Sequence, residues 1–256
     1  MKATLEVTFA PAEFDALKGR DLSRTTCVVF DVLRATSTMA MALSNGAEAI
    51  VPVASIAEAL RLRQQQPAIL LAGERDGVRI PASLTGGIDF DLGNSPREFT
   101  RDKVQGKTIV MTTTNGTRAL RACAGARRVL ISSFLNLRAT GDFLARERPS
   151  LLLLVCGGTV EEAAYEDVLG AGALSDLLWP DSSDTGVADS ALIARRLFAA
   201  ETADLAAAFG RSRNGRRLLG LEDLREDVAC CAQRDRVNLA AGMDRDGKIR
   251  VLWAQE

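Results

Sequence analysis

The chain has 256 residues, 47% of them hydrophobic and 25% charged, with 32 basic and 33 acidic side chains and a formal net charge of −1. This composition excludes wholesale disorder and a fibrous protein, and the balanced charge gives no overall attraction to nucleic acid or to an acidic membrane. The chain contains no histidine, so Ser-His-Asp hydrolases, phosphohistidine enzymes and His-ligated zinc proteases are excluded, and an enzyme would have to work with carboxylates, hydroxyls, Cys, Lys and Arg.

Short apolar runs alternate with helical patterns along the chain. The N-terminal residues alternate as in a strand, the run 26–31 predicts a buried strand, and 36–43 predicts a helix with hydroxyl residues at its start. A helix is also expected at 55–65, and further strands at 49–53, 68–72, 108–112, 128–132, 151–156 and 247–253. Apolar strands separated by helices are typical of a mostly parallel sheet covered on both faces. The sequence therefore predicts an α/β fold, a three-layer α/β/α sandwich.

One pattern recurs within the predicted sheet. Residues 27–53 and 108–132 both run strand, hydroxyl-rich turn, helix, Gly-Ala and strand, so they are either two related βαβ halves or two ordinary crossovers. Residues 187–235 predict a helical C-terminal region, whose apolar residues fit either the core or the interface of a homodimer. The only linker-like stretch, 179–186, is short. We therefore expect a single domain over residues 1–256.

The cysteines and the N-terminus indicate the cellular compartment. The five cysteines are odd in number and contain no C-x-x-C pair, which argues against a disulfide framework and a tetrathiolate zinc site. Glu6 interrupts the region where a signal peptide needs an unbroken apolar run. The longest apolar run, 151–156, is far too short to span a bilayer. We expect a cytoplasmic protein with no membrane or nucleic-acid partner.

Hydroxyl and amide loops follow several predicted strands, at the sheet edge where open α/β folds bind ligands. The loop 113–117 opens a helix, and its backbone N–H groups, with the helix dipole, suit a phosphate or a carboxylate. Asn94 or Ser95 is expected to cap a helix that starts at Pro96. Each such loop is also an ordinary helix cap. Three such loops lie beside arginines in the predicted arrangement. They fit an anion-binding site and a set of ordinary helix caps equally well.

Carboxylates at the strand ends are candidate metal ligands. Asp31, Glu74, Glu166 and Asp167 would supply oxygen ligands without His or Cys, a combination that selects Mg²⁺ or Mn²⁺ over zinc. Asp167 fits a solvated helix start equally well. Asp31 directly follows Val-Val-Phe, where an unpaired charge is costly, so it needs a partner such as a metal or Arg34.

Two residues are candidate covalent nucleophiles. Cys156 ends the most apolar strand, but no Arg follows at the spacing of a phosphocysteine loop, so a buried structural thiol is favoured. Asp31 resembles the phospho-accepting aspartate of the haloacid dehalogenase class, which has a second Asp two positions on where this chain has Leu33. Direct attack by water is the preferred route, with a covalent Asp31 left open.

Five ordered motifs, at 30–38, 72–75, 90–96, 111–120 and 212–217, resemble those of the 2-phosphosulfolactate phosphatase (ComB) family. The resemblance spans most of the chain. It implies an α/β/α fold and Mg²⁺-dependent hydrolysis of 2-phospho-3-sulfolactate to 3-sulfolactate and phosphate, an activity of coenzyme M biosynthesis. Two alternatives stay open: a phosphatase of another small 2-phosphohydroxy acid, and a non-enzymatic anion-binding metabolite sensor.

Residues and resemblance together give one hypothesis for the site. Mg²⁺ would be held by Asp31, Glu74 and Asp167, with Asp31, Arg34 and Glu74 as the catalytic residues. The phosphorylated acid substrate would be bound by hydroxyls, amides and arginines, namely Thr36, Ser37, Arg75, Asn94, Ser95, Thr114, Asn115, Gly116, Thr117, Arg118 and Arg213.

Overall fold

Ten strands form one sheet in the computed structural model, which describes residues 4–179 and 186–254. Most of the predicted linker, 180–185, lies outside the described residues. In chain order the strands are β1 (Thr4–Thr8), β2 (Thr25–Phe30), β3 (Ala49–Pro52), β4 (Leu70–Arg75), β5 (Val78–Arg79), β6 (Thr108–Thr112), β7 (Arg128–Ser132), β8 (Leu151–Cys156), β9 (Leu239–Met243) and β10 (Ile249–Ala254).

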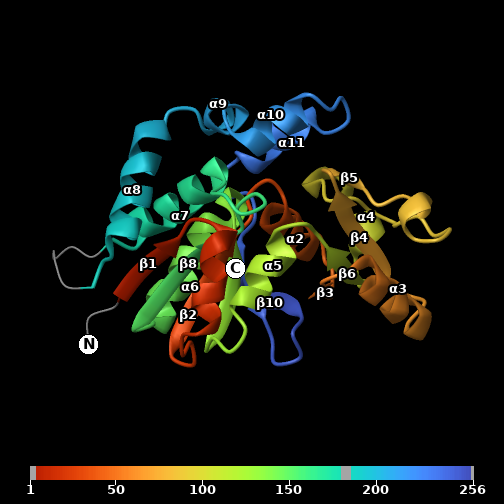
Figure 1. Cartoon of the computed structure of the whole chain (residues 1–256), viewed down its shortest axis with the longest axis horizontal. Coiled ribbons are helices and arrows are strands. Elements are labelled where there is room, and N and C mark those ends of the chain that lie inside the picture. The colour runs from red at the N-terminus through yellow and green to blue at the C-terminus, as the bar shows by residue number, and fades with distance from the viewer. Residues whose placement is uncertain (1–3, 180–185, 255–256) are drawn as a thin grey trace.

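Helices flank the sheet on both sides (Figure 1). They are α1 (Phe14–Lys18), α2 (Ala35–Ser44), α3 (Ile56–Gln65), α4 (Arg101–Val104), α5 (Gly116–Ala122), α6 (Leu137–Glu147), α7 (Tyr165–Leu177), α8 (Asp189–Glu201), α9 (Leu205–Gly210), α10 (Arg213–Leu219) and α11 (Arg225–Cys231). The last four confirm the helical region predicted at 187–235. Within the described residues, no helix is long and apolar enough to cross a membrane.

The central strand β2 shows why the sheet is covered on both faces. Its side chains alternate between two apolar clusters, Cys27 and Val29 in one and Val28 and Phe30 in the other. The first cluster includes residues of α2 and α5, and the second includes residues of α6, α7 and α8. Because β2 buries both its faces, it reads as one continuous apolar run. The predicted α/β/α sandwich is confirmed.

The sheet consists of two parallel blocks, which the sequence did not reveal. Its order is β1-β8-β2-β7-β9-β10-β3-β6-β4-β5. Strands β1, β8, β2 and β7 are mutually parallel, and so are β3, β6 and β4. Between the blocks stands the β9–β10 hairpin, with antiparallel pairing at β7–β9, β9–β10 and β10–β3. Three antiparallel steps make the two blocks run in opposite directions.

Strand β9 was not predicted, and its composition explains why. It reads Leu-Ala-Ala-Gly-Met, with little of the β-branched and aromatic character typical of strands. A Cβ on Gly242 would lie 2.4 Å from the carbonyl oxygen of Val129 on the neighbouring strand. The glycine therefore serves close backbone approach at the centre of the sheet.

The two similar units of the sequence both cross from one block to the other. The first runs from β2 through α2 to β3, and the second runs from β6 through α5 to β7. Neither unit therefore pairs its own two strands, as an ordinary βαβ unit would. The crossings bring the loop after β2 beside the loop after β6. This proximity is shown at Gly116, where a Cβ would lie 2.8 Å from Asp31 Oδ2.

Candidate active site

A cavity of about 160 Å³ is lined by residues of both strand blocks. The loop after β2, the β4–β5 turn, the β6–α5 loop and α10 contribute to its wall. Its lining is mostly polar: Asp31, Leu33, Arg34, Glu74, Asp76, Gly77, Asn94, Thr113, Thr114, Asn115, Thr159, Val160, Asn214, Arg217 and Leu218. The structure thus brings together six of the predicted site residues, Asp31, Arg34, Glu74, Asn94, Thr114 and Asn115.

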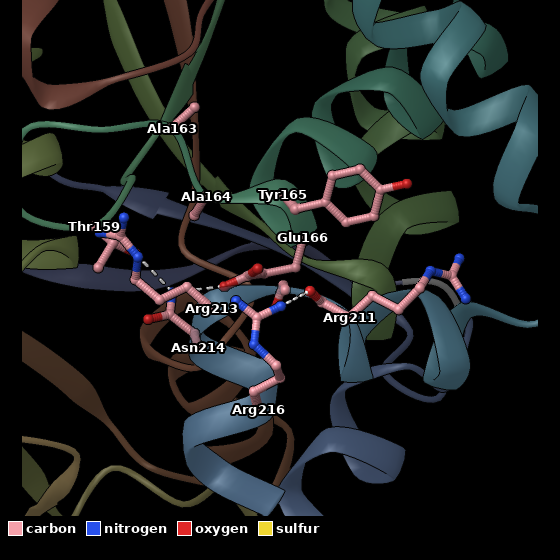
Figure 2. A pocket seen from close by; sticks show the side chains of 10 residues that line it. Thr159, Ala163, Ala164, Tyr165, Glu166, Arg211, Arg213, Asn214 and Arg216 are labelled. Atoms are coloured by element: carbon pink, nitrogen blue, oxygen red, sulfur yellow. Dashed lines mark hydrogen bonds between the residues drawn. The ribbon is translucent and has the colours of Figure 1, made fainter.

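A second cavity, of about 370 Å³, shares part of this wall (Figure 2). Thr159 and Asn214 line both cavities. The amide of Asn214 donates to Thr159 Oγ1 at 2.8 Å and to Glu166 Oε1 at 2.7 Å. Asn214 and its partners therefore form the wall that the two cavities share. Three arginines line the second cavity, namely Arg211, Arg213 and Arg216.

Asp31 follows β2 directly and caps helix α2. Its Oδ1 accepts a hydrogen bond from the Ala35 N–H at 3.0 Å, whereas Oδ2 accepts none from the described residues. A Cβ on Gly116 or Gly157 would lie 2.8 or 3.2 Å from Oδ2, so two glycines leave room for this atom. The structure replaces the predicted hydroxyl caps with this carboxylate, which has one oxygen anchored and one free.

Burial raises the pKa of three carboxyl groups around this point. Desolvation is the largest cause for Asp31, and the charges of Glu74 and Glu166 add to it, which raises the pKa of Asp31 to about 7. Desolvation also raises the pKa of Glu166 and Asp167, and the charge of Asp31 contributes for Asp167. Carboxyl groups that disfavour one another's charged form favour a bound cation or a proton between them.

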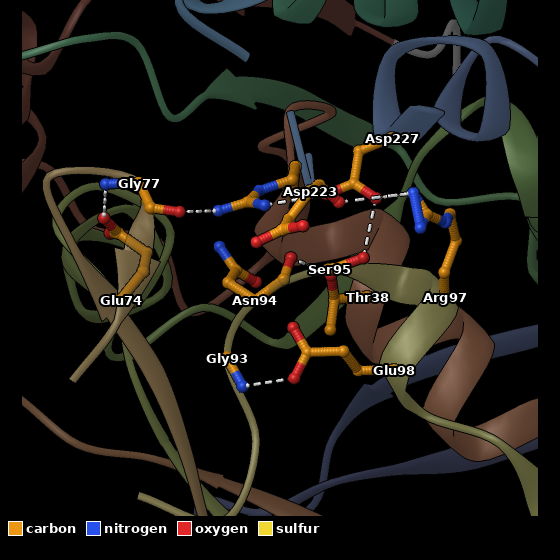
Figure 3. Close-up of polar contacts among 11 residues, drawn as sticks. Thr38, Glu74, Gly77, Gly93, Asn94, Ser95, Arg97, Glu98, Asp223 and Asp227 are labelled. Atoms are coloured by element: carbon orange, nitrogen blue, oxygen red, sulfur yellow. Dashed lines mark hydrogen bonds and ion pairs between the residues drawn. The ribbon is translucent and has the colours of Figure 1, made fainter. Parts of the chain in front are cut away.

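Arg34 pairs with Asp227 rather than with Asp31. Its Nη1 donates to Asp227 Oδ2 at 2.7 Å, and its Nη2 donates to the carbonyl oxygen of Gly77. Ser95 Oγ donates to the other oxygen of Asp227 at 2.6 Å (Figure 3), instead of capping the short helix that follows it. The pair is buried, with side chains 3% and 0% exposed. This network fixes the guanidinium at the cavity wall.

Glu74, at the end of β4, is hydrogen-bonded on both oxygens. Oε1 accepts from the N–H and the hydroxyl of Thr114, both at 2.8 Å, and Oε2 accepts from the Gly77 N–H at 2.8 Å. These bonds join the β4–β5 turn to the β6–α5 loop. The geometry gives Glu74 an orienting role in the wall, and a role as a metal ligand stays a prediction.

Asp167 is likewise engaged on both oxygens. Oδ1 accepts from the Val32 N–H at 2.7 Å and Oδ2 from the Gly158 N–H at 2.9 Å. The side chain is buried, so it anchors two loops to the start of α7 and is not a solvated helix start. In residues 4–179 and 186–254, no three or more Asp, Glu, Cys or His are arranged to hold a metal. The predicted set of Asp31, Glu74 and Asp167 is not assembled.

Two asparagines that line the cavity each have a buried amide oxygen without a partner among the described residues. Asn94 Oδ1 and Asn115 Oδ1 accept no hydrogen bond in the described part of the chain. A buried polar atom without a partner is costly, so a ligand that met these oxygens would relieve that cost. Together with Asp31 Oδ2 they are hard oxygen donors of the kind Mg²⁺ prefers, and Mg²⁺ commonly needs only one or two protein carboxylates. The residues fit a cation centred on Asp31.

Three predicted hydroxyl and turn residues lie behind the cavity wall. The Thr36 hydroxyl bonds to the backbone of Asp31, and Ser37 Oγ donates to the carbonyl oxygen of Val32 at 2.8 Å. The Thr117 hydroxyl donates to a carbonyl one helical turn earlier, at 3.0 Å. Such bonding to nearby backbone is common for Ser and Thr at helix starts. These hydroxyls stabilise the loops and do not line the cavity.

The three arginines expected to bind the acid end of the substrate also lie outside the cavity lining. Arg75 turns back onto the strands and donates to Thr112 Oγ1 at 3.1 Å. Arg118 and Arg213 form ion pairs with exposed glutamates that follow β8. The arginine that does line the cavity, besides the predicted Arg34, is Arg217.

The sequence interpretation missed Asp227, Asn214 and Arg217. The last two belong to the 212–217 motif, and their spacing of three residues places both on one helix face. That spacing could have found them. Asp227 had no such signal, because its partner is Arg34, distant in the chain.

The candidate nucleophile Cys156 is a buried thiol. It is fully buried, and burial raises its pKa well above that of a free cysteine. A thiol of this kind is unreactive, because the thiolate is the nucleophile. The structure therefore favours the structural interpretation of Cys156.

Comparison with known proteins assigns the family. A protein of Symbiobacterium thermophilum named "Probable 2-phosphosulfolactate phosphatase" is 39% identical over 229 residues, which cover 89% of this chain and 91% of that protein. A protein of Prochlorococcus marinus with the same name is 39% identical over 226 residues, 87% of this chain and 90% of the other. A Clostridium acetobutylicum protein, also so named, is 33% identical over 226 residues, 88% and 92% of the two chains. The profile of one family matches residues 13–244, and the chain accordingly belongs to the 2-phosphosulpholactate phosphatase family.

Proposed function

We propose that this protein hydrolyses the phosphate ester of 2-phospho-3-sulfolactate, giving 3-sulfolactate and phosphate. Family membership supports the reaction class. The observation that carries the proposal is the cavity lined by Asp31, Asn94 and Asn115, where Asp31 leaves one carboxylate oxygen free and the two amide oxygens are buried without a partner among the described residues. Such a donor set suits a cation and the phosphoryl group bound to it.

We propose Mg²⁺ as the cofactor, held by Asp31 with the amide oxygens of Asn94 and Asn115. When bound, Mg²⁺ supplies Lewis-acid stabilisation of phosphoryl oxygens. A positive charge at this point would also offset the burial that raises the pKa of Asp31, Glu166 and Asp167, and the repulsion by neighbouring carboxylates that adds to it for Asp31 and Asp167.

The chain's own residues supply orientation and positive charge. Arg34 is held by Asp227 and by the Gly77 carbonyl, so its guanidinium needs no rearrangement to stabilise charge that develops on the phosphoryl oxygens. Glu74 holds Thr114 and Gly77 in place in the same wall, where the Gly77 carbonyl meets Arg34. Rigid placement of this kind is how a site binds a reacting group in one orientation.

Direct attack by water is the proposed route. Cys156 is buried as a thiol and does not line the cavity. Residue 33 is Leu, whereas the phospho-aspartate class has a second Asp at that position.

We also propose a reducing, cytoplasmic setting. Every cysteine in the described structure is free, which supports this proposal.

The test is phosphate release from a panel of esters in the presence of Mg²⁺. The panel contains 2-phospho-3-sulfolactate, phospholactate and 2-phosphoglycerate, and kcat/KM is compared for each. We expect the highest value for the sulfonated ester. A higher value for phospholactate or phosphoglycerate would assign the chain to another small 2-phosphohydroxy acid, and binding without turnover of any ester would make it an anion-binding sensor.

A further inference from the structure

Helix α10 divides its side chains between the two cavities. Asn214, Arg217 and Leu218 line the candidate active site, while Arg213 and Arg216 line the second cavity. Residues separated by three or four positions share one face of a helix, so the two sets lie on neighbouring faces. Asn214 lies at the boundary and lines both cavities.

Two contacts set the rotation of α10 and therefore which arginine faces the active site. The Ser212 side chain caps the helix by accepting from the Gly215 N–H at 2.9 Å. A Cβ on Gly215 would lie 1.8 Å from the carbonyl oxygen of Phe209, so only glycine permits this close approach to α9. With the helix held in this way, Arg217 is directed to the site by the backbone.

The side chain of Arg217 packs on the turn that also holds Arg34. Asp76 and Gly77 have φ values of 57° and 80° and form the two-residue turn between β4 and β5. A Cβ on Gly77 would lie 3.7 Å from Arg217 Nε, and the Gly77 carbonyl accepts from Arg34. Both guanidinium groups therefore lie close to Gly77, which brings two positive charges to the same part of the cavity wall.

These two arginines differ in how free they are. Arg34 is committed to a buried carboxylate at 2.7 Å. Arg217 meets only Asp76 among the described acidic residues, at 3.4 Å, and the Asp76 side chain is 93% exposed. An exposed ion pair at that distance contributes little. Arg217 can therefore exchange Asp76 for an anionic group of a ligand at small cost.

We infer that Arg217 binds the second acid group of the substrate, a carboxylate or a sulfonate, while the phosphate lies at Asp31. The inference rests on the proposed function. A guanidinium presents two parallel N–H donors, which suit the oxygens of either group. The substrate class is accordingly a small phosphate monoester that carries a further strong acid within reach of the β4–β5 turn.

Four esters separate the two acid groups. Isopropyl phosphate has neither, phospholactate has the carboxylate, 1-sulfopropan-2-yl phosphate has the sulfonate, and 2-phospho-3-sulfolactate has both. We expect Arg217→Met to lower kcat/KM about 10- to 100-fold, mainly through KM, for the esters that carry the group it binds. Isopropyl phosphate should be hydrolysed at an unchanged rate, and Arg217→Lys should recover part of the loss.

Arg216→Met is the matched control, because it removes the same kind of side chain from the neighbouring face of the same helix. It should leave the selectivity of the wild type intact. An equal loss for all four esters in Arg217→Met would overturn the inference, because the side chain would then serve the fold or the phosphate. The inference would also be overturned if Arg213→Met lost the preference for esters with a second acid group while Arg217→Met kept it.

Binding of the product 3-sulfolactate, measured by calorimetry, separates this inference from the proposed function. Arg217→Met should weaken binding by at least about tenfold relative to wild type and to Arg216→Met. Equal affinities would overturn the assignment of Arg217 even if the enzyme is active. Absence of phosphate release from every ester would contradict the proposed function and leave the binding result to decide on Arg217.

Discussion

Two features of the Asp31 environment have opposite effects on the ionisation of its carboxyl group. One oxygen caps α2 through Ala35, which favours the ionised form, while burial beside Glu74 and Glu166 favours the neutral form. Burial prevails and raises the pKa of Asp31 to about 7. Without a bound cation, the carboxylate is therefore a source of instability at neutral and alkaline pH.

This conflict predicts the pH dependence of stability in EDTA. Because the pKa of Asp31 is raised in the folded protein, its contribution to stability is complete below about pH 4 and lost as the pH rises through about 7. Asp31→Asn removes this loss. We expect the variant to gain at least about 5 °C in Tm over wild type at pH 8, and much less at pH 5. Thermal scans at both pH values check this, and the same Tm difference at the two would contradict the assignment.

The space beside Asp31 Oδ2 gives a second prediction at this scale. A Cβ on Gly116 would lie 2.6 Å from Ala35 Cβ and 2.8 Å from Asp31 Oδ2. Gly116→Ala must therefore displace the carboxylate, and we expect kcat/KM to fall by about 10- to 100-fold. Gly19→Ala is the control, because its Cβ would meet nothing closer than 3.7 Å. Steady-state kinetics of the two variants decide, and an unimpaired Gly116→Ala would show that the position of Asp31 is unimportant.

Sequence reasoning succeeded where a residue's place is set by the backbone alone. Asp31 directly follows β2 and Glu74 lies near the end of β4. Both were predicted at strand ends, Asp31 with the added reason that an unpaired charge after Val-Val-Phe is costly. It failed where a side chain had to choose among partners. Arg75 lies at the end of β4 and Arg118 in the first turn of α5, as expected. Their side chains, however, bond to Thr112 and to an exposed glutamate. No pattern in the sequence specifies these partners.

Helix α11 contributes one buried anchor to the site. It carries Asp227, which is fully buried and accepts from Arg34 and Ser95. In Figure 1 the helices α9, α10 and α11 lie together at the top of the view, above the strands. The C-terminal helical region thus supplies the wall residues Asn214 and Arg217 as well as the anchor of Arg34.

Asp227→Asn tests the anchor. It leaves the buried Arg34 charge without its carboxylate, and breaking a buried pair typically costs about 3–5 kcal/mol. Urea unfolding should show a loss of that order, together with a lower kcat. Asp176→Asn is the control, because its pair with Arg195 is half exposed and should contribute about 0–1 kcal/mol. Equal losses in the two variants would contradict a special role for α11.

At the scale of the whole molecule, the β9–β10 hairpin joins two blocks that run in opposite directions. Ile249 pairs with Ile50 across β10 and β3 and is fully buried. The direction of a strand in a sheet depends on contacts between distant segments, and β9 lacks a strand-like composition. For these reasons the layers could be predicted from the sequence, but the two-block topology and the site between the blocks could not.

The junction gives a prediction about stability. Ile249→Ala should destabilise the protein by about 2–5 kcal/mol, because a cavity would open where the blocks meet. Val251→Ala in the same strand is the control, because Val251 is 42% exposed and its loss should cost much less. Chemical unfolding followed by circular dichroism compares the two, and similar losses would show that the junction is not critical.

The role proposed for Asp31 is to organise the site of a Mg²⁺-dependent phosphatase. It is tested most directly by phosphate release from 2-phospho-3-sulfolactate, measured for wild type and for Asp31→Asn, each with Mg²⁺ and with EDTA. We predict that wild type is active with Mg²⁺, that EDTA removes the activity and added Mg²⁺ restores it, and that Asp31→Asn is slower by about 100-fold or more with Mg²⁺. Asp31→Asn with the Mg²⁺-dependent rate of wild type would contradict the claim.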